Sequence, residues 1–275
     1  MTTLSLPGHE HFTQGTMETH MKKVFLNEFN GLEAQELLNN AANTTAIVTF
    51  GSCESHGPHC CLGPDVFVPT EVARRVAMKL DNVVVAPCLP YGTSMHYNKF
   101  PLSITLRYET VIAVAEDVLC SLIHNGITRI FILNGHDGNI PALDIAAHKV
   151  KERHPEARLL FMPAWWEKIG PLMGDRFEVW NGLGHAGEGE TSIMMAVRPE
   201  LVDLTHAVSQ VPENMIDINK AVNVIWDIAE VSKTGATGDP TKASMEKGEK
   251  MLELLTDLVA DAITRMNRTN WEYTV

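Results

Sequence analysis

Short apolar runs alternate with helical patterns through the first 165 residues of the chain. The runs are AIVTF (46–50), VVVAP (83–87), RIFILN (129–134) and RLLFMP (158–163). Each run is predicted to be a buried strand, because the segments between the runs have helical periodicity. Strands that alternate with helices favour a mostly parallel sheet covered by helices on both faces. The sequence therefore predicts an α/β fold.

The first helical patterns begin at Pro69, Tyr108 and Ile140. A glycine-interrupted stretch, residues 171–190, is predicted to be a lid or loop, and another helix is predicted from about Thr191.

The C-terminal part, residues 246–266, has apolar residues at helical spacing and is predicted to be a helix packed on the sheet. The sequence contains no internal repeat, low-complexity tract or linker. One domain spanning residues 1–275 is therefore predicted.

The charge of the chain argues against two classes of partner. Lys and Arg number 22 against 34 Asp and Glu, which gives a formal net charge of -12 and disfavours nucleic acid and anionic lipid. A small-molecule partner is expected instead. No segment approaches the roughly 18 uninterrupted apolar residues of a membrane span, and residues 1–23 lack the apolar core of a secretion signal. Neither secretion nor membrane anchoring is expected.

The cysteines and the glycine motifs argue against several competing chemistries. The five cysteines form no CxxC pair, and the adjacent Cys60 and Cys61 suit a disulfide framework poorly, so a reducing cytoplasm is expected. A thiol nucleophile with His59 or His136 as its base would lack a recognised hydrolase signature. No GxGxxG follows a strand and no GxxxxGK[ST] occurs, so nucleotide binding lacks its usual motifs.

Polar loops follow the first and third predicted strands, as GSCESHGPHCCLGPD (51–65) and GHDGN (135–139). Because ligands gather beyond the carboxyl ends of parallel strands, five side chains of these loops are predicted to share one rim: Glu54, His56, Asp65, His136 and Asp137. In an extended segment Glu54 and His56 point the same way, as the ligands of one metal or of a close metal pair do. The residues alone leave a structural alternative open, in which Asp65 caps a helix and His59 is a loop histidine.

The stretch GLGHAGEGETS (182–192) adds further candidates. Glu188 and Glu190 fit either ligand binding or the N-terminus of a helix, where the macrodipole favours carboxylates. His185 lies between Gly184 and Ala186 and has no place on a helical face, which favours a catalytic role.

Five motifs together resemble the creatininase, or creatinine amidohydrolase, family in order and spacing. They are GSCESHGPHCCLGPD, YGTSMHYNKFP followed by SITLRYET, FILNGHDGN, GHAGEGETS with MMAVRPELV, and TGDPTKASMEKGEK. The resemblance covers roughly residues 40–255. It implies a three-layer α/β/α sandwich, a hydrolytic site with two divalent metal ions, and a homo-oligomer that is often a hexamer.

The resemblance also implies roles for individual residues. Glu54, His56, Asp65 and His136 match the family's metal ligands, with Asp65 as the bridging carboxylate, and His185 matches its catalytic histidine. Creatininase carries a further glutamate ligand where this chain has Gly138, so either Glu190 is expected to supply the missing carboxylate or the second metal is weak or absent. The ions are expected to be zinc, with manganese or iron as alternatives.

The resemblance leaves the substrate open. Asp137 stands where creatininase uses a tyrosine, so the pocket is altered. The first hypothesis is a metal-activated water that opens a cyclic amide or breaks another non-peptide C–N bond. The alternatives are hydrolysis of a carbon–carbon bond in a cyclic ketone derived from inositol, and a non-catalytic binding protein with the same fold. The residues predicted to line the pocket are Ser94, His96, Asp137, Trp165, Trp166 and Trp180.

Overall fold

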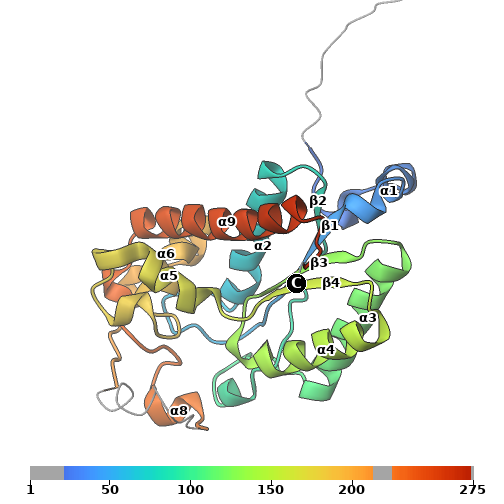
Figure 1. Cartoon of the computed structure of the whole chain (residues 1–275). Helices are drawn as coiled ribbons and strands as arrows, with labels where there is room; N and C mark the ends of the chain where they lie inside the picture. The colour runs from blue at the N-terminus through green and yellow to red at the C-terminus, as the bar shows by residue number, and fades with distance from the viewer. Residues whose placement is uncertain (1–21, 213–224, 274–275) are drawn as a thin grey trace, which may run out of the picture.

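The computed structural model describes residues 22–212 and 225–273 (Figure 1). Residues 1–23, in which we found no secretion signal, lie almost entirely outside these ranges. The described strands form one sheet in the order β2-β1-β3-β4. They are β1 (Thr45–Phe50), β2 (Val83–Val85), β3 (Arg129–Asn134) and β4 (Arg158–Met162). Every pairing between them is parallel, which confirms the predicted α/β fold.

Helices cover both faces of this sheet and make the three layers of an α/β/α sandwich (Figure 1). On one side lie α2 (Pro64–Lys79), α5 (Trp165–Met173), α6 (Glu188–Val197) and α9 (Met245–Arg268). On the other side lie α3 (Tyr108–His124) and α4 (Ile140–Arg153). Two shorter helices are α1 (Gly31–Leu38) and α8 (Ile228–Val231). No helix within the described ranges combines the length and the apolar character needed to cross a bilayer.

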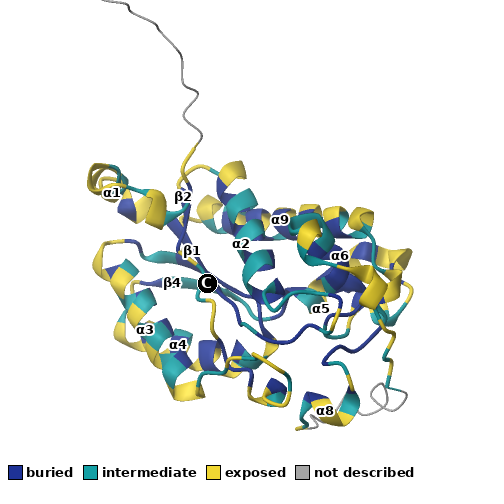
Figure 2. Ribbon diagram, turned by 180° about the vertical axis from the view of Figure 1, so that it is seen from behind, coloured by how far each residue is buried: buried dark blue, intermediate teal, exposed yellow. Residues whose placement is uncertain are grey.

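Separate hydrophobic cores fill the two faces of the sheet, and Figure 2 shows the buried strands between the helical layers. Because side chains alternate along a strand, β3 directs Phe131 and Leu133 toward α2 and α9, and Ile130 and Ile132 toward α3 and α4. Burial on both faces explains why the strands are continuous apolar runs. The prediction of a buried strand was wrong for β4, whose residues are all half-buried.

The order of the strands places a switch point between β1 and β3. The chain leaves β1 through α2 to reach β2 on one side, and it returns through α3 to reach β3 on the other side. Such a switch point leaves a crevice at the carboxyl ends of the two neighbouring strands. The two loops that carry the predicted donors therefore meet at one edge of the sheet.

Two helices begin earlier than predicted. α2 begins at Pro64, and Pro69 lies inside it rather than at its start. Proline fits the first turn of a helix because it lacks an N–H that would be unpaired there. α6 begins at Glu188 rather than at Thr191. Both early starts place a predicted metal ligand, Asp65 or Glu190, in the first turn of a helix, where the macrodipole favours a carboxylate.

Candidate metal centre

Asp65 lies at the centre of the crevice because α2 begins between two strands. Gly51 and Gly135 are the first residues after β1 and β3, and a Cβ on either would overlap the carbonyl oxygen of Asp65. The two glycines thus allow the first turn of α2 to approach both strand ends. The loop between β1 and α2 carries Glu54 and His56, which are buried almost completely.

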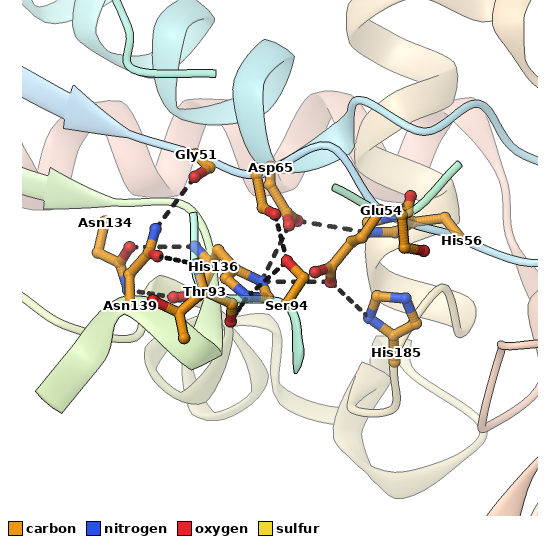
Figure 3. Close-up of polar contacts among 12 residues, drawn as sticks. Gly51, Glu54, His56, Asp65, Thr93, Ser94, Asn134, His136, Asn139 and His185 are labelled. Atoms are coloured by element: carbon orange, nitrogen blue, oxygen red, sulfur yellow. Dashed lines mark hydrogen bonds and ion pairs between the residues drawn. The ribbon is translucent and has the colours of Figure 1, made fainter. Parts of the chain in front are cut away.

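The two oxygens of Asp65 face different imidazoles (Figure 3). Oδ1 lies 3.3 Å from Nε2 of His56, and Oδ2 lies 3.1 Å from Nδ1 of His136. The same Nδ1 of His136 lies 3.2 Å from Oε1 of Glu54. One carboxylate therefore connects the donors of the β1 loop with the donor of the β3 loop.

The segment at the start of α6 brings two further groups to this cluster. Oε2 of Glu190 lies 3.9 Å from Nε2 of His56 and 3.9 Å from Nδ1 of His185. Nδ1 of His185 also lies 3.9 Å from Oε1 of Glu54. The rings of His56 and His185 contact each other, with centroids 4.1 Å apart.

Three sets of donor atoms are close enough to hold a metal ion. They are Glu54, Asp65 and His136; His56, Asp65 and Glu190; and Glu54, His56 and His185. The donor atoms within each set lie within 4.8 Å of one another. The structure therefore brings together all five residues predicted as ligands, and Glu54, His56 and Asp65 each belong to two of the sets.

A backbone carbonyl orients each imidazole of the cluster. The distances are 3.1 Å from His56 Nδ1 to Glu54 O, 2.9 Å from His136 Nε2 to Thr93 O, and 2.6 Å from His185 Nε2 to Ser55 O. Because a carbonyl oxygen only accepts hydrogen bonds, the nitrogen that faces it carries the ring proton. The other nitrogen of each ring keeps a lone pair for a metal or a proton.

The donors strongly shift one another's pKa values. Burial lowers the pKa of His56, but Asp65 and Glu190 outweigh the burial and raise this pKa to about 10. Burial raises the pKa of Asp65, but His56 and His136 outweigh it and lower this pKa to about 2. Burial is the main cause that raises the pKa of Glu190 to about 7. The buried carboxylates thus stabilise positive charge at the centre of the cluster.

The cluster fits divalent metal ions. Glu54 Oε2 is buried without a hydrogen-bond partner in the described structure, and the contacts of the buried atoms His56 Nε2 and Asp65 Oδ2 are to other groups of the cluster itself. The described residues that line the adjoining cavity include no Lys or Arg. Buried carboxylates without a partner are costly, so this arrangement favours bound cations. Mixed carboxylate and imidazole donors suit zinc, manganese and iron.

A cavity of about 620 Å³ opens beside the metal donors. Four tryptophans, which we call the aromatic wall, are among the residues that line it: Trp165, Trp166, Trp180 and Trp226. The first two belong to α5, and Trp180 begins the short 3₁₀ turn Trp180–Gly182. His96 and Asp137 also line the cavity. Five of the six residues predicted to line the pocket therefore do so.

Ser94 is the exception, and its assignment to the pocket is corrected. It is fully buried and is not among the residues that line the cavity. Its Oγ lies 2.5 Å from Oγ of Ser52 and 3.3 Å from Nε2 of His136. The loop after β2 passes behind His136, so Ser94 contacts the imidazole of His136 instead of facing the cavity (Figure 3).

Tyr97 and Trp226 line the cavity but were missed from the sequence. Tyr97 is 3% exposed, its ring centroid lies 4.5 Å from that of His185, and its hydroxyl has no hydrogen-bond partner among the described residues. Burial raises the pKa of Tyr97 well above its ordinary value, so the phenol keeps its proton. The short 3₁₀ turn Met95–Tyr97 that directs this side chain inward has no periodic pattern to reveal it.

His59 and the adjacent cysteines have structural positions. Nε2 of His59 lies 3.1 Å from the carbonyl oxygen of Ala186 and 3.0 Å from Oγ1 of Thr191, which ties the β1 loop to α6. Cys60 and Cys61 pack against the hydrophobic core and do not line the cavity. A thiol nucleophile at these positions would not reach a substrate bound there.

Comparison with known proteins agrees with this site. A family model described as creatinine amidohydrolase matches residues 27–263. The chain belongs to the creatininase family. Members of this family are metal-dependent hydrolases, so the chain is an enzyme of this type.

Curated and solved members of the creatininase family cover most of the chain. A creatinine amidohydrolase of Pseudomonas putida is 29% identical over 88% of this chain and 96% of its own length. A 3-dehydro-scyllo-inosose hydrolase of Thermotoga maritima is 28% identical over 80% of this chain and 78% of its own length. A solved manganese creatininase and a Zn-Zn variant are both 27% identical, cover 89% of this chain and 98% of their own, and have TM-scores of 0.78 and 0.77.

Proposed function

We propose that this creatininase-family hydrolase opens a cyclic amide, or cleaves another non-peptide C–N bond, in a small neutral or cationic substrate. The observation that carries the proposal is the convergence of five metal donors and His185 beside a cavity that four tryptophans also line. The name of the Pseudomonas putida relative supports the amide class.

The donor sets define where two divalent ions would bind. Glu54, Asp65 and His136 would hold one ion, His56, Asp65 and Glu190 would hold the other, and Asp65 would bridge them. Three carboxylates balance most of the charge of two divalent ions. We propose zinc first, with manganese or iron as alternatives, because solved relatives are named for zinc and for manganese.

Ions bound there would supply Lewis acidity, which lowers the pKa of a water molecule and polarises a carbonyl group. His185 is placed to move the proton. Its Nε2–H is held by the carbonyl of Ser55, and its Nδ1 faces the carboxylates of Glu54 and Glu190. Burial is the main cause that lowers the pKa of His185 well below its ordinary value. The neutral ring can therefore accept a proton at Nδ1 and return it to the departing nitrogen.

The cavity supports a flat substrate without negative charge. The aromatic wall offers stacking surfaces for a ring and for a delocalised cation. Asp137 is exposed at the cavity, and no lining residue in the described ranges is a Lys or Arg that would pair with a carboxylate or phosphate. A neutral or cationic heterocyclic amide fits both properties.

A second candidate reaction is hydrolysis of a carbon–carbon bond beside a ketone in an inositol-derived ring. The Thermotoga maritima relative supports this reaction, and His96 and Asp137 offer polar groups to a hydroxyl-rich ligand. Turnover of a panel of lactams and inososes separates the two reactions. A binding protein without chemistry remains the lesser alternative, and tight binding of one panel member by the metal-loaded protein without turnover would support it.

Three further properties remain proposals. They are a homo-oligomer, with a hexamer as one form, a single domain spanning residues 1–275, and a cytoplasmic location. Light scattering on the purified protein gives the oligomeric number directly. Limited proteolysis that produced two stable fragments would contradict the single domain.

The metal centre is tested by elemental analysis of the purified protein beside Glu190→Gln. We expect two ions per chain in the wild type and one in the variant, because Glu190 belongs to only one of the two proposed sites. Glu200→Gln, an exposed glutamate just after α6, is the matched control and should keep both ions. One ion or none in both the wild type and Glu190→Gln would remove Glu190 from the site and reject the two-ion proposal.

A further inference from the structure

Asn139 connects three loops behind His136. Its side chain is buried, its Oδ1 accepts the N–H of Thr93 at 2.9 Å, and its Nδ2 donates to the carbonyl of Gly51 at 3.0 Å. Gly51 follows β1, Thr93 lies in the loop after β2, and Asn139 lies in the loop after β3. Figure 3 shows these contacts on the side of His136 that faces away from His185.

The loop that Asn139 holds supplies the carbonyl that orients His136. The N–H of Thr93 bonds to Asn139, while the carbonyl of the same residue lies 2.9 Å from Nε2 of His136. With its proton directed at this carbonyl, the ring presents Nδ1 to Glu54 and Asp65. The position of Thr93 therefore decides how His136 faces a metal ion.

The carbonyl of Thr93 also explains the glycine at position 138. A Cβ on Gly138 would overlap this oxygen and would lie 2.6 Å from Nε2 of His136. A side chain at this position would push away the group that orients the ring. The arrangement thus excludes a carboxylate ligand at position 138 and is compatible with Glu190 supplying it from α6.

The other two imidazoles are oriented without Asn139. His56 and His185 face the carbonyls of Glu54 and Ser55, two consecutive residues of the β1 loop. The two proposed ions therefore share the β1 loop, which Asn139 bonds at Gly51, but different carbonyls orient their imidazoles. The ion at His136 depends on the connection between three loops, and the ion at His56 depends on the β1 loop and α6.

We propose that Asn139 is a positioning residue that sets the affinity of the ion held by Glu54, Asp65 and His136, and that it leaves the affinity of the ion held by His56, Asp65 and Glu190 unchanged. The inference rests on the proposed two-ion centre. Loss of a group that orients a metal-binding histidine typically costs about 10- to 100-fold in metal affinity.

The test is a titration of chelator-stripped protein with Zn²⁺ against a chromophoric chelator, which yields a dissociation constant for each ion. Asn139→Ala removes both hydrogen bonds of the side chain. Gly92→Ala disturbs the same connection from the other side, because its Cβ would overlap Oδ1 of Asn139. We expect one constant to rise roughly 10- to 100-fold in each variant and the other to stay the same. If Asn139→Ala does not fold, Gly92→Ala decides the question.

A double-mutant cycle identifies the affected ion. In a His136→Ala background, Asn139→Ala should cause no further loss of affinity, whereas in a His56→Ala background it should keep its full effect. Asn125→Ala is the matched control, because the Asn125 side chain bonds only the end of α3, at Ser121, and should change neither constant.

The outcomes separate the inference from the proposed function. A wild type that binds one ion or none would reject the two-ion centre itself. A wild type with two ions, combined with variants that weaken both ions equally or neither, would overturn the role of Asn139. A lower unfolding temperature of the metal-free variant with unchanged constants would likewise show that Asn139 only stabilises the fold.

Discussion

Two groups of residues at the cavity, which we call the donor side and the aromatic wall, are built in different ways. On the donor side, side chains from the strand-end loops and from the first turns of α2 and α6 are buried and contact one another or backbone carbonyls. On the aromatic wall, large rings from α5 and later segments lie against the cavity, and Nε1 of Trp165 is buried without a partner in the described structure. Hydrogen bonds fix the first side, and packing forms the second.

From this difference we predict that the donor side carries out the reaction and that the aromatic wall selects the substrate. In the proposed function, groups on the donor side hold metal ions and move a proton, so changes there should alter metal content or kcat. Groups on the aromatic wall meet the substrate through surface alone, so changes there should alter KM. Variants on each side test whether the separation is real.

Asp65→Ala should have the largest effect, because Asp65 is the one residue common to both proposed ion sites. We expect loss of both ions and at least a roughly 10³-fold fall in kcat/KM, since metal ions supply several kcal/mol of transition-state stabilisation. Elemental analysis and assays with the best substrate of the panel measure the two effects. Retention of either ion would show that Asp65 does not bridge, and the exposed Asp261→Ala on α9 serves as control.

His185→Ala should lower kcat by roughly 10²- to 10⁴-fold while both ions remain bound. The reason is that His185 contributes a proton-accepting nitrogen rather than one of the five proposed ligands. Steady-state kinetics together with elemental analysis provides the measurement. Loss of an ion along with activity would instead make His185 a ligand, in the set that it forms with Glu54 and His56.

Trp166→Leu should have the smallest effect, and it tests the role of the aromatic wall. We expect KM to rise roughly 10-fold, with kcat and metal content nearly unchanged, because only stacking surface is lost. Trp271→Phe is the control, since Trp271 is buried away from the cavity and should affect stability without changing KM. A fall in kcat for Trp166→Leu with unchanged KM would contradict the separation.

The layers of the fold and the residues of the donor side were easier to predict from the sequence than the backbone groups that orient the donor side chains. Apolar strands and polar strand-end loops leave a pattern in residue types, so β1, β3 and the clustering of Glu54, His56 and His136 could be predicted. The resemblance to the creatininase family was needed to assign Glu190.

The supports of the donor side were missed for a physical reason. The carbonyl oxygens of Thr93 and Ser55 orient two imidazoles, and every residue has a carbonyl, so no residue type marks this role. The path of the loop after β2 depends on tertiary contacts, and this loop placed Ser94 behind His136 and Tyr97 in the cavity. The start of α2 was misplaced because proline is common at a helix start, and Pro64 and Pro69 both fit that rule.

The composition of the aromatic wall gives the protein an intrinsic optical reporter. The chain has five tryptophans, and four of them line the cavity. The fifth, Trp271, is buried elsewhere, and its Nε1 donates to Asn267. Four of the five tryptophans therefore adjoin the cavity that a ligand would enter, and Trp271 lies apart from it. Binding of an unlabelled compound should change the emission even when no bond is broken, so candidate substrates can be found before any product is known.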